Sequence, residues 1–156
     1  MANVDNPRGF VNPRPKAGHS GRIETLKSDG VGTIAKGDPV TFVASGRYAR
    51  AITSETISHV AQEYVAATAD LPFKALPVED YTFEIQVDDN SITTDASVGA
   101  AFDLIADAAG DATLGTSNLE LDGDASTNDD MTVVGLVDRP DNDNSLTNNA
   151  VRVTIP

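Results

Sequence analysis

Two histidines are the side chains of this sequence best suited to move protons, because histidine titrates nearest to neutral pH. His19 lies in a segment rich in proline and glycine, where we expect nothing to orient it as a base. His59 lies in the apolar segment "ISHVAQEYVAA", where we expect a structural role. The chain has no cysteine and no G-x-S-x-G, H-E-x-x-H or glycine-rich phosphate-binding motif. The sequence therefore singles out no catalytic residue, although the order of residues along the chain leaves a Ser-His-Asp arrangement open.

Acidic loops offer a second kind of chemistry, the binding of calcium. The stretch "DGDASTNDD" begins like an EF-hand loop. Its candidate ligands are Asp122, Asp124, Ser126 and Asp129 or Asp130. Thr127 and Val133 then stand where that loop needs glycine and glutamate, and the loop beginning at Asp141 fails in the same way. We expect ordinary turns here, no metal ligand and no cofactor, with a calcium-binding β adhesion domain as an alternative.

The pattern of apolar residues predicts a β-rich fold around these groups. In "DYTFEIQVDD" the apolar residues Tyr81, Phe83, Ile85 and Val87 alternate with polar ones, which is typical of a half-buried strand. Residues 30–52 predict strand, turn, strand, turn, strand, with Ser45-Gly46 as a two-residue hairpin. Residues 54–66 favour a strand over a helix. Further strands are expected in "GAAFDLIA", "NLELD", "MTVVGLVD" and "AVRVTI". The glycine in "MTVVGLVD" predicts a bulge or a close approach of another backbone segment. Eight or nine short strands indicate a mostly β protein, a small antiparallel β-barrel or sandwich.

The charge of the chain is strongly acidic and unevenly distributed. The formal net charge is −13 at pH 7, and no Lys or Arg lies between Lys74 and Arg139, where fifteen Asp and Glu fall. Such a surface repels nucleic acid and anionic membranes, so we expect neither as a partner. No stretch reaches the ~20 apolar residues of a membrane helix, and the start of the chain lacks an apolar secretion signal.

The first 22 residues have a different character from the rest. Four basic residues against Asp5 give them a charge of +3, and two Asn-Pro pairs favour extended backbone. We expect residues 1–22 to form an extended N-terminal arm, and residues 23–156 to form a single β-rich domain that folds without it. The arm could be disordered, wrap its own body, or add to the sheet edge of a neighbouring subunit. Its candidate contacts with a capsid or neighbouring subunit are Pro7, Arg8, Phe10, Val11, Pro13 and Arg14.

Several segments, in order along the chain, resemble the capsid decoration (cement) proteins of tailed bacteriophages. They are "MANVDNPRGF", "HVAQEYVAA", "PVEDYTFEIQVDDNSIT", "AAFDLIA" with "NLELD", and "VVGLVDRPDN" with "NNAVRVTI". The chain departs from the expected pattern at His59, where that pattern has glycine. The segment "GLVD" around Gly135 and Asp138 also resembles a motif of small trimeric dUTP pyrophosphatases, but their P-R-S-G segment and glycine-rich C-terminal tail are missing here.

The resemblance to decoration proteins implies a non-enzymatic role on the outer surface of the virion. Such proteins bind the major capsid protein at local three-fold sites, commonly as homotrimers, and brace the shell against internal DNA pressure. Neighbouring decoration subunits would be further partners, reached through the N-terminal arm. The alternative is another virion component, a head fibre base or a tail protein, although the chain shows no fibre-like repeat.

Overall fold

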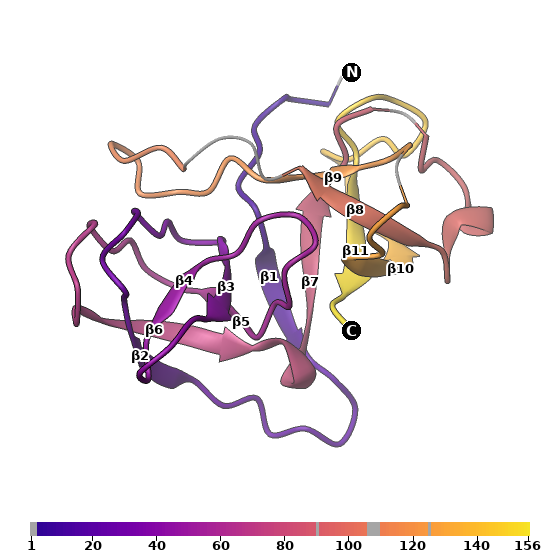
Figure 1. Ribbon diagram of the computed structural model, residues 1–156. Helices are drawn as coiled ribbons and strands as arrows, with labels where there is room; N and C mark the ends of the chain where they lie inside the picture. The colour runs from indigo at the N-terminus through magenta and orange to yellow at the C-terminus, as the bar shows by residue number, and fades with distance from the viewer. Residues whose placement is uncertain (1–2, 90, 106–109, 125) are drawn as a thin grey trace.

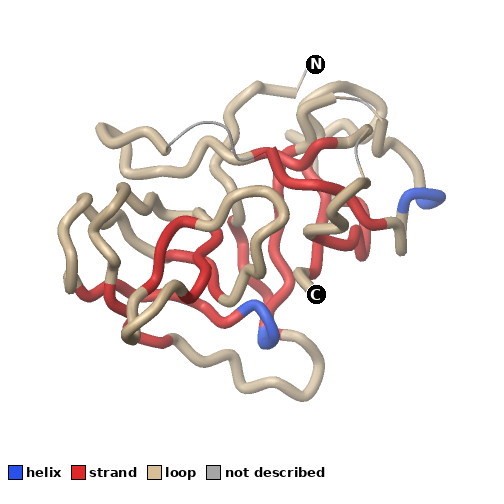
Figure 2. Tube along the Cα trace, in the orientation of Figure 1, coloured by secondary structure: helices blue, strands red, loops and turns tan. Residues whose placement is uncertain are grey.

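The computed structural model describes residues 3–89, 91–105, 110–124 and 126–156. They form eleven β-strands and two short 3-10 helices, connected by long loops (Figures 1 and 2). The strands are β1 (Val11–Pro15), β2 (Glu24–Lys27), β3 (Pro39–Phe42), β4 (Tyr48–Arg50), β5 (His59–Ala61), β6 (Pro72–Pro77), β7 (Tyr81–Gln86), β8 (Ala101–Ile105), β9 (Glu120–Asp122), β10 (Met131–Leu136) and β11 (Ala150–Thr154). The 3-10 helices are η1 (Val78–Asp80) and η2 (Asp95–Ser97). No helix in these ranges is long and apolar enough to cross a membrane.

The strands form two antiparallel sheets that pack together as a sandwich (Figure 1). One sheet has the order β1-β7-β11-β10-β8-β9, and the other has the order β2-β6-β5-β3-β4. The six-stranded sheet is curved, so that the regions next to its two end strands, β1 and β9, lie close together. The Gly9 amide donates to the Leu119 carbonyl at 3.2 Å, and the Asp88 amide donates to the Leu121 carbonyl at 3.1 Å. The mostly β, antiparallel fold that the sequence predicts is confirmed.

Apolar side chains form two buried clusters, and the five-stranded sheet contributes to both. Val60 and Leu76 join the larger cluster, whose other members come mainly from the six-stranded sheet. Their chain neighbours Ala61 and Ala75 join the smaller cluster, with Phe73 among its members. Successive residues of a strand point to opposite faces. The sheet is therefore buried on both faces at its central strand β5, which has three buried residues in a row, whereas β2 and the start of β6 carry exposed residues.

Three local features that the sequence predicts are confirmed, namely a turn, a bulge and a strand. Ser45 and Gly46 both have positive φ, 54° and 76°, as the two-residue turn between β3 and β4 requires. The pairing of β10 with β11 shifts register between Val133 and Gly135, which is the expected bulge at the glycine. Residues 59–61 form a strand, as favoured over a helix.

Other expectations are corrected by the structure. The count of eight or nine strands was too low, since β1, β2 and β6 were not predicted; β1 and β6 each contain two prolines, which weaken the strand signal. The strand expected within residues 30–35 does not form. Ile34 makes an isolated bridge with Val65 and turns its side chain into the smaller cluster, so these residues serve as a cover for the sheet.

Candidate functional site

The N-terminal arm lies on its own domain. Strand β1 pairs with the edge of β7, with Val11 opposite Glu84 and Arg14 opposite Thr82 (Figure 1). Phe10 is 2% exposed, and its ring packs edge-on against Phe83 with centroids 5.7 Å apart. Of the arrangements that the sequence leaves open, the structure has the arm wrapped on its own body.

A glycine at position 9 allows the arm to approach the body this closely. The amide of Phe10 donates to the carbonyl of Gly37 at 2.9 Å. A Cβ atom on Gly9 would lie 2.4 Å from that carbonyl oxygen and 2.6 Å from the Ser117 side chain, and the φ of Gly9 is +62°. The sequence "GF" therefore combines a close backbone contact with an aromatic side chain that enters the core.

The six arm residues that the sequence singles out divide into two groups. Phe10 is buried and Pro7 and Val11 are partly buried, whereas Arg8, Pro13 and Arg14 are exposed. The role of Phe10 as an anchor on a neighbouring subunit is corrected, because its ring already fills the core of its own chain. The expectation that residues 23–156 fold without the arm stays a prediction, and the burial of Phe10 and the pairing of β1 indicate that deletion of the arm would destabilise them.

A buried carboxylate, which the sequence analysis missed, fixes the arm to the sheet. Glu84 on β7 is 3% exposed, and both of its oxygens accept hydrogen bonds. One oxygen accepts from the amide of Asn12 at 2.7 Å and from Arg139 at 2.6 Å. The other accepts from Arg152 on β11. The only signal in the sequence is an acidic residue inside an alternating strand, which is also the pattern of an exposed one.

A cleft of about 580 Å³ opens beside the docked arm. Its walls come from arm residues 3–13, from β7 and from residues 139–150, and they are rich in Asn and Gln side chains. Glu84 lies in the cleft, where its carboxylate accepts three hydrogen bonds, from Asn12 and the two arginines. The groups of the cleft therefore hold the arm in place.

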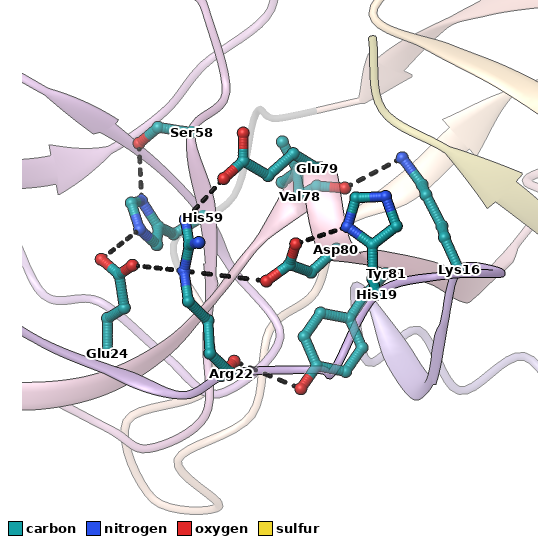
Figure 3. Close-up of polar contacts among 10 residues, drawn as sticks. All are labelled: Lys16, His19, Arg22, Glu24, Ser58, His59, Val78, Glu79, Asp80 and Tyr81. Atoms are coloured by element: carbon teal, nitrogen blue, oxygen red, sulfur yellow. Dashed lines mark hydrogen bonds and ion pairs between the residues drawn. The ribbon is translucent and has the colours of Figure 1, made fainter.

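Both histidines belong to a second polar network, at the base of the arm (Figure 3). His19 contacts Asp80 at 2.7 Å, and His59 contacts Glu24 at 3.1 Å. Arg22 joins the two pairs, with Glu24 at 2.7 Å and Asp80 at 3.7 Å. We call this network the polar clamp; its members are His19, Arg22, Glu24, His59, Glu79 and Asp80. It ties the loop between β1 and β2 to the 3-10 helix η1.

The contacts of the polar clamp orient His19 and favour the charged forms of Asp80 and Glu24. His19 is oriented by Asp80, so the prediction that nothing positions it was wrong. The hydrogen bond from His19 holds the pKa of Asp80 below its usual value, against the opposing effect of desolvation. The hydrogen bond from His59 lowers the pKa of Glu24 in the same way, and Arg22 adds to the shift of both carboxylates.

We expect the Asp80→Asn variant to have a lower melting temperature than the wild type at neutral pH, by an amount that shrinks in acid. A carboxylate with a lowered pKa stabilises the fold above its unfolded-state pKa, about 3.9 for Asp, and this contribution is lost as pH falls through the folded-state value. The difference should narrow as pH falls from about 5 and vanish below the folded-state pKa of Asp80. Thermal unfolding followed by circular dichroism measures it. The exposed Asp138→Asn variant is the control, and a difference for Asp80→Asn that persists unchanged in acid would contradict the prediction.

The loop that resembles an EF-hand folds around an anion. The amides of Thr127, Asn128 and Asp129 donate to the carboxylate of Asp103 on β8, at 2.7–3.1 Å. In the part of the chain that the structure describes, no group of three or more acidic or histidine side chains could hold a metal ion. The turns that the sequence predicts here are the observed arrangement.

Comparisons with known proteins add no assignment to this geometry. The chain matches no protein-family model, and no curated protein or solved structure shows significant similarity to it.

Proposed function

We propose that the protein is a non-enzymatic structural component of a tailed-bacteriophage virion, which binds the outer surface of the head and stabilises the lattice of the major capsid protein. It would add to the mature capsid in the host cytoplasm, as a homotrimer that contacts neighbouring decoration subunits through the arm. The segments that resemble decoration proteins support this proposal, and they include the start of the arm and strand β7.

The observation that carries the proposal is the exposed edge of the docked arm. Arg8, Pro13 and Arg14 remain exposed on a chain whose net charge is −13. Because the arm is already ordered on its own domain, binding through this edge avoids the roughly 1–2 kcal/mol per residue needed to order a free chain. A preorganised basic edge suits a protein that must add in many copies to a preformed shell.

The form of this edge favours contacts through side chains. Two of the five residues of β1 are prolines, which have no backbone N–H to donate to a further strand. One edge of β1 is already paired with β7. The addition of the arm to a neighbour's sheet, which the sequence suggested, is thus replaced by a proposal in which Arg8 and Arg14 make the contacts.

The proposal predicts saturable binding to capsids. Purified protein is mixed with expanded, undecorated capsids of the phage that encodes it, and bound protein is measured by co-sedimentation. We expect a fixed ratio to the major capsid protein, and a higher temperature of capsid disruption once the sites are filled. Unexpanded capsids are the control and should bind less. Failure of the folded protein to bind expanded capsids would overturn the proposed function.

A further inference from the structure

Near β1, β7 and β11 the outward face of the six-stranded sheet is polar, and three arginines surround one buried glutamate there. Residues opposite each other in an antiparallel pair share a face, and the register places Arg14 beside Thr82 and Arg152 beside Glu84. We call this area the arginine face. Its members are Arg14, Thr82, Thr132, Arg139, Arg152 and Thr154, where Thr132 and Thr154 are opposite each other and Arg139 follows β10. Five of the six are partly buried, and Arg14 is exposed.

Positive charge exceeds negative charge on the arginine face. Arg139 and Arg152 share one buried carboxylate, Glu84, and Arg139 also contacts the exposed Asp141 at 2.9 Å. Arg14 makes no ion pair or side-chain hydrogen bond with any residue that the structure describes. The buried Nη1 of Arg152 likewise has no hydrogen-bond partner among those residues. One cation of this area is therefore left without a counter-charge.

Apart from Glu84 and Asp141, the acidic groups near this face, Asp5 and Glu120, lie beyond Glu84 at the other end of β7 from Arg14. Gln86, two residues beyond Glu84 on the same side of β7, donates to Asp5 and to Glu120. The uncompensated charge is thus confined to the Arg14 end, next to the threonine hydroxyls. Burial lowers the pKa of Arg152, and repulsion from Arg14 and Arg139 lowers it further, while the attraction of Glu84 raises it. The three guanidinium groups are therefore close enough to repel one another.

We infer that the arginine face docks carboxylate side chains of an acidic partner protein, with Arg14 as the main contact. A guanidinium group binds a carboxylate through two parallel hydrogen bonds, and the threonine hydroxyls beside it supply neutral donors. A rigid sheet holds Arg14 in place, so little order is lost on binding. The single uncompensated cation of this face complements a carboxylate of an acidic protein surface, whereas a nucleic-acid backbone would need several free cations in a row. The identification of this partner with the major capsid protein rests on the proposed function.

An acidic peptide tests the inference without a capsid. The probe is a peptide of alternating Glu and Ser, compared with one of alternating Gln and Ser, and binding is followed by NMR on the full chain. We expect the acidic peptide to shift the signals of Arg14, Thr82 and Thr154, and the Arg14→Glu variant to weaken its binding at least about tenfold. Lys27→Glu, an equal charge change on the exposed edge strand β2, is the matched control and should bind like the wild type. Absence of shifts at the arginine face would overturn the inference.

Capsid binding by the same variants separates the inference from the proposed function. If the wild type and Lys27→Glu bind expanded capsids and Arg14→Glu binds at least about tenfold more weakly, the acidic partner is on the capsid. Equal binding of Arg14→Glu and the wild type would overturn the inference and leave the proposed function standing. Peptide binding without capsid binding would overturn the proposed function and support the inference. Self-association that depends on Arg14, measured by sedimentation equilibrium, would assign the carboxylates to a neighbouring copy of this chain and overturn the identification of the acidic partner with the major capsid protein.

Discussion

The Phe10→Ala variant is expected to lose about 3–5 kcal/mol of unfolding free energy, as other buried aromatic residues do when they are truncated. Phe10 is 2% exposed and belongs to the larger apolar cluster, where its ring meets Phe83 at 5.7 Å. The loss has two parts, the apolar surface that is no longer buried and the cavity that remains. The second part is reduced if the arm detaches, but β1 then loses its pairing with β7. Either way the arm acts as a structural part of the domain.

Urea unfolding followed by circular dichroism measures this effect. The matched control is Phe42→Ala, because Phe42 is 55% exposed, and its loss should stay near about 0.5 kcal/mol. Deletion of residues 1–22 removes Phe10 together with β1 and should destabilise the domain at least as much. A Phe10→Ala protein as stable as the Phe42→Ala control would show that the ring does not contribute to the core in solution.

The Glu84→Gln variant is expected to be destabilised by about 3–5 kcal/mol, the usual cost of removing one partner of a buried ion pair. Glu84 is 3% exposed and is the shared acceptor of Arg139 and Arg152. The substitution preserves the shape of the side chain but leaves Arg152 without a carboxylate and Arg139 with only the exposed Asp141. It also replaces an acceptor of the Asn12 amide, so the effect extends to the arm.

Glu79→Gln is the matched control for this second variant. Glu79 also contacts an arginine, Arg22 at 2.5 Å, but its side chain is 65% exposed. Exposed ion pairs contribute about 0–1 kcal/mol, so the control should unfold almost like the wild type. Comparable losses in the two variants, measured by urea unfolding at pH 7, would show that burial does not distinguish the two carboxylates.

Features that depend on near neighbours in the chain could be predicted from the sequence. The alternation in "DYTFEIQVDD" predicted β7, and the Ser45-Gly46 pair predicted the hairpin between β3 and β4. Gly135 predicted the bulge in β10. Each signal is a preference of a few adjacent residues for one backbone conformation or for one buried face, so it is visible without knowledge of the fold.

The strand formed by the arm could not be predicted in this way. Its segment "VNPRP" has no alternation of apolar residues, and its two prolines weaken any strand signal. It becomes a strand because the edge of β7 is available to pair with it and because Phe10 fits the core beside Phe83. These partners lie about seventy residues away in the chain. Whether the arm is free or docked therefore depends on tertiary contacts with β7 and Phe83.

Local sequence patterns establish a mostly β fold with acidic turns, a basic N-terminal segment and the geometry of the turn at Ser45-Gly46. Which polar groups meet depends on tertiary structure. It brought His19 to Asp80, His59 to Glu24, and three arginines to the neighbourhood of Glu84. The physical reason is that a strand periodicity records which residues are buried, whereas a contact between charged groups depends on sheet order and register. Those are set by the packing of all the strands together.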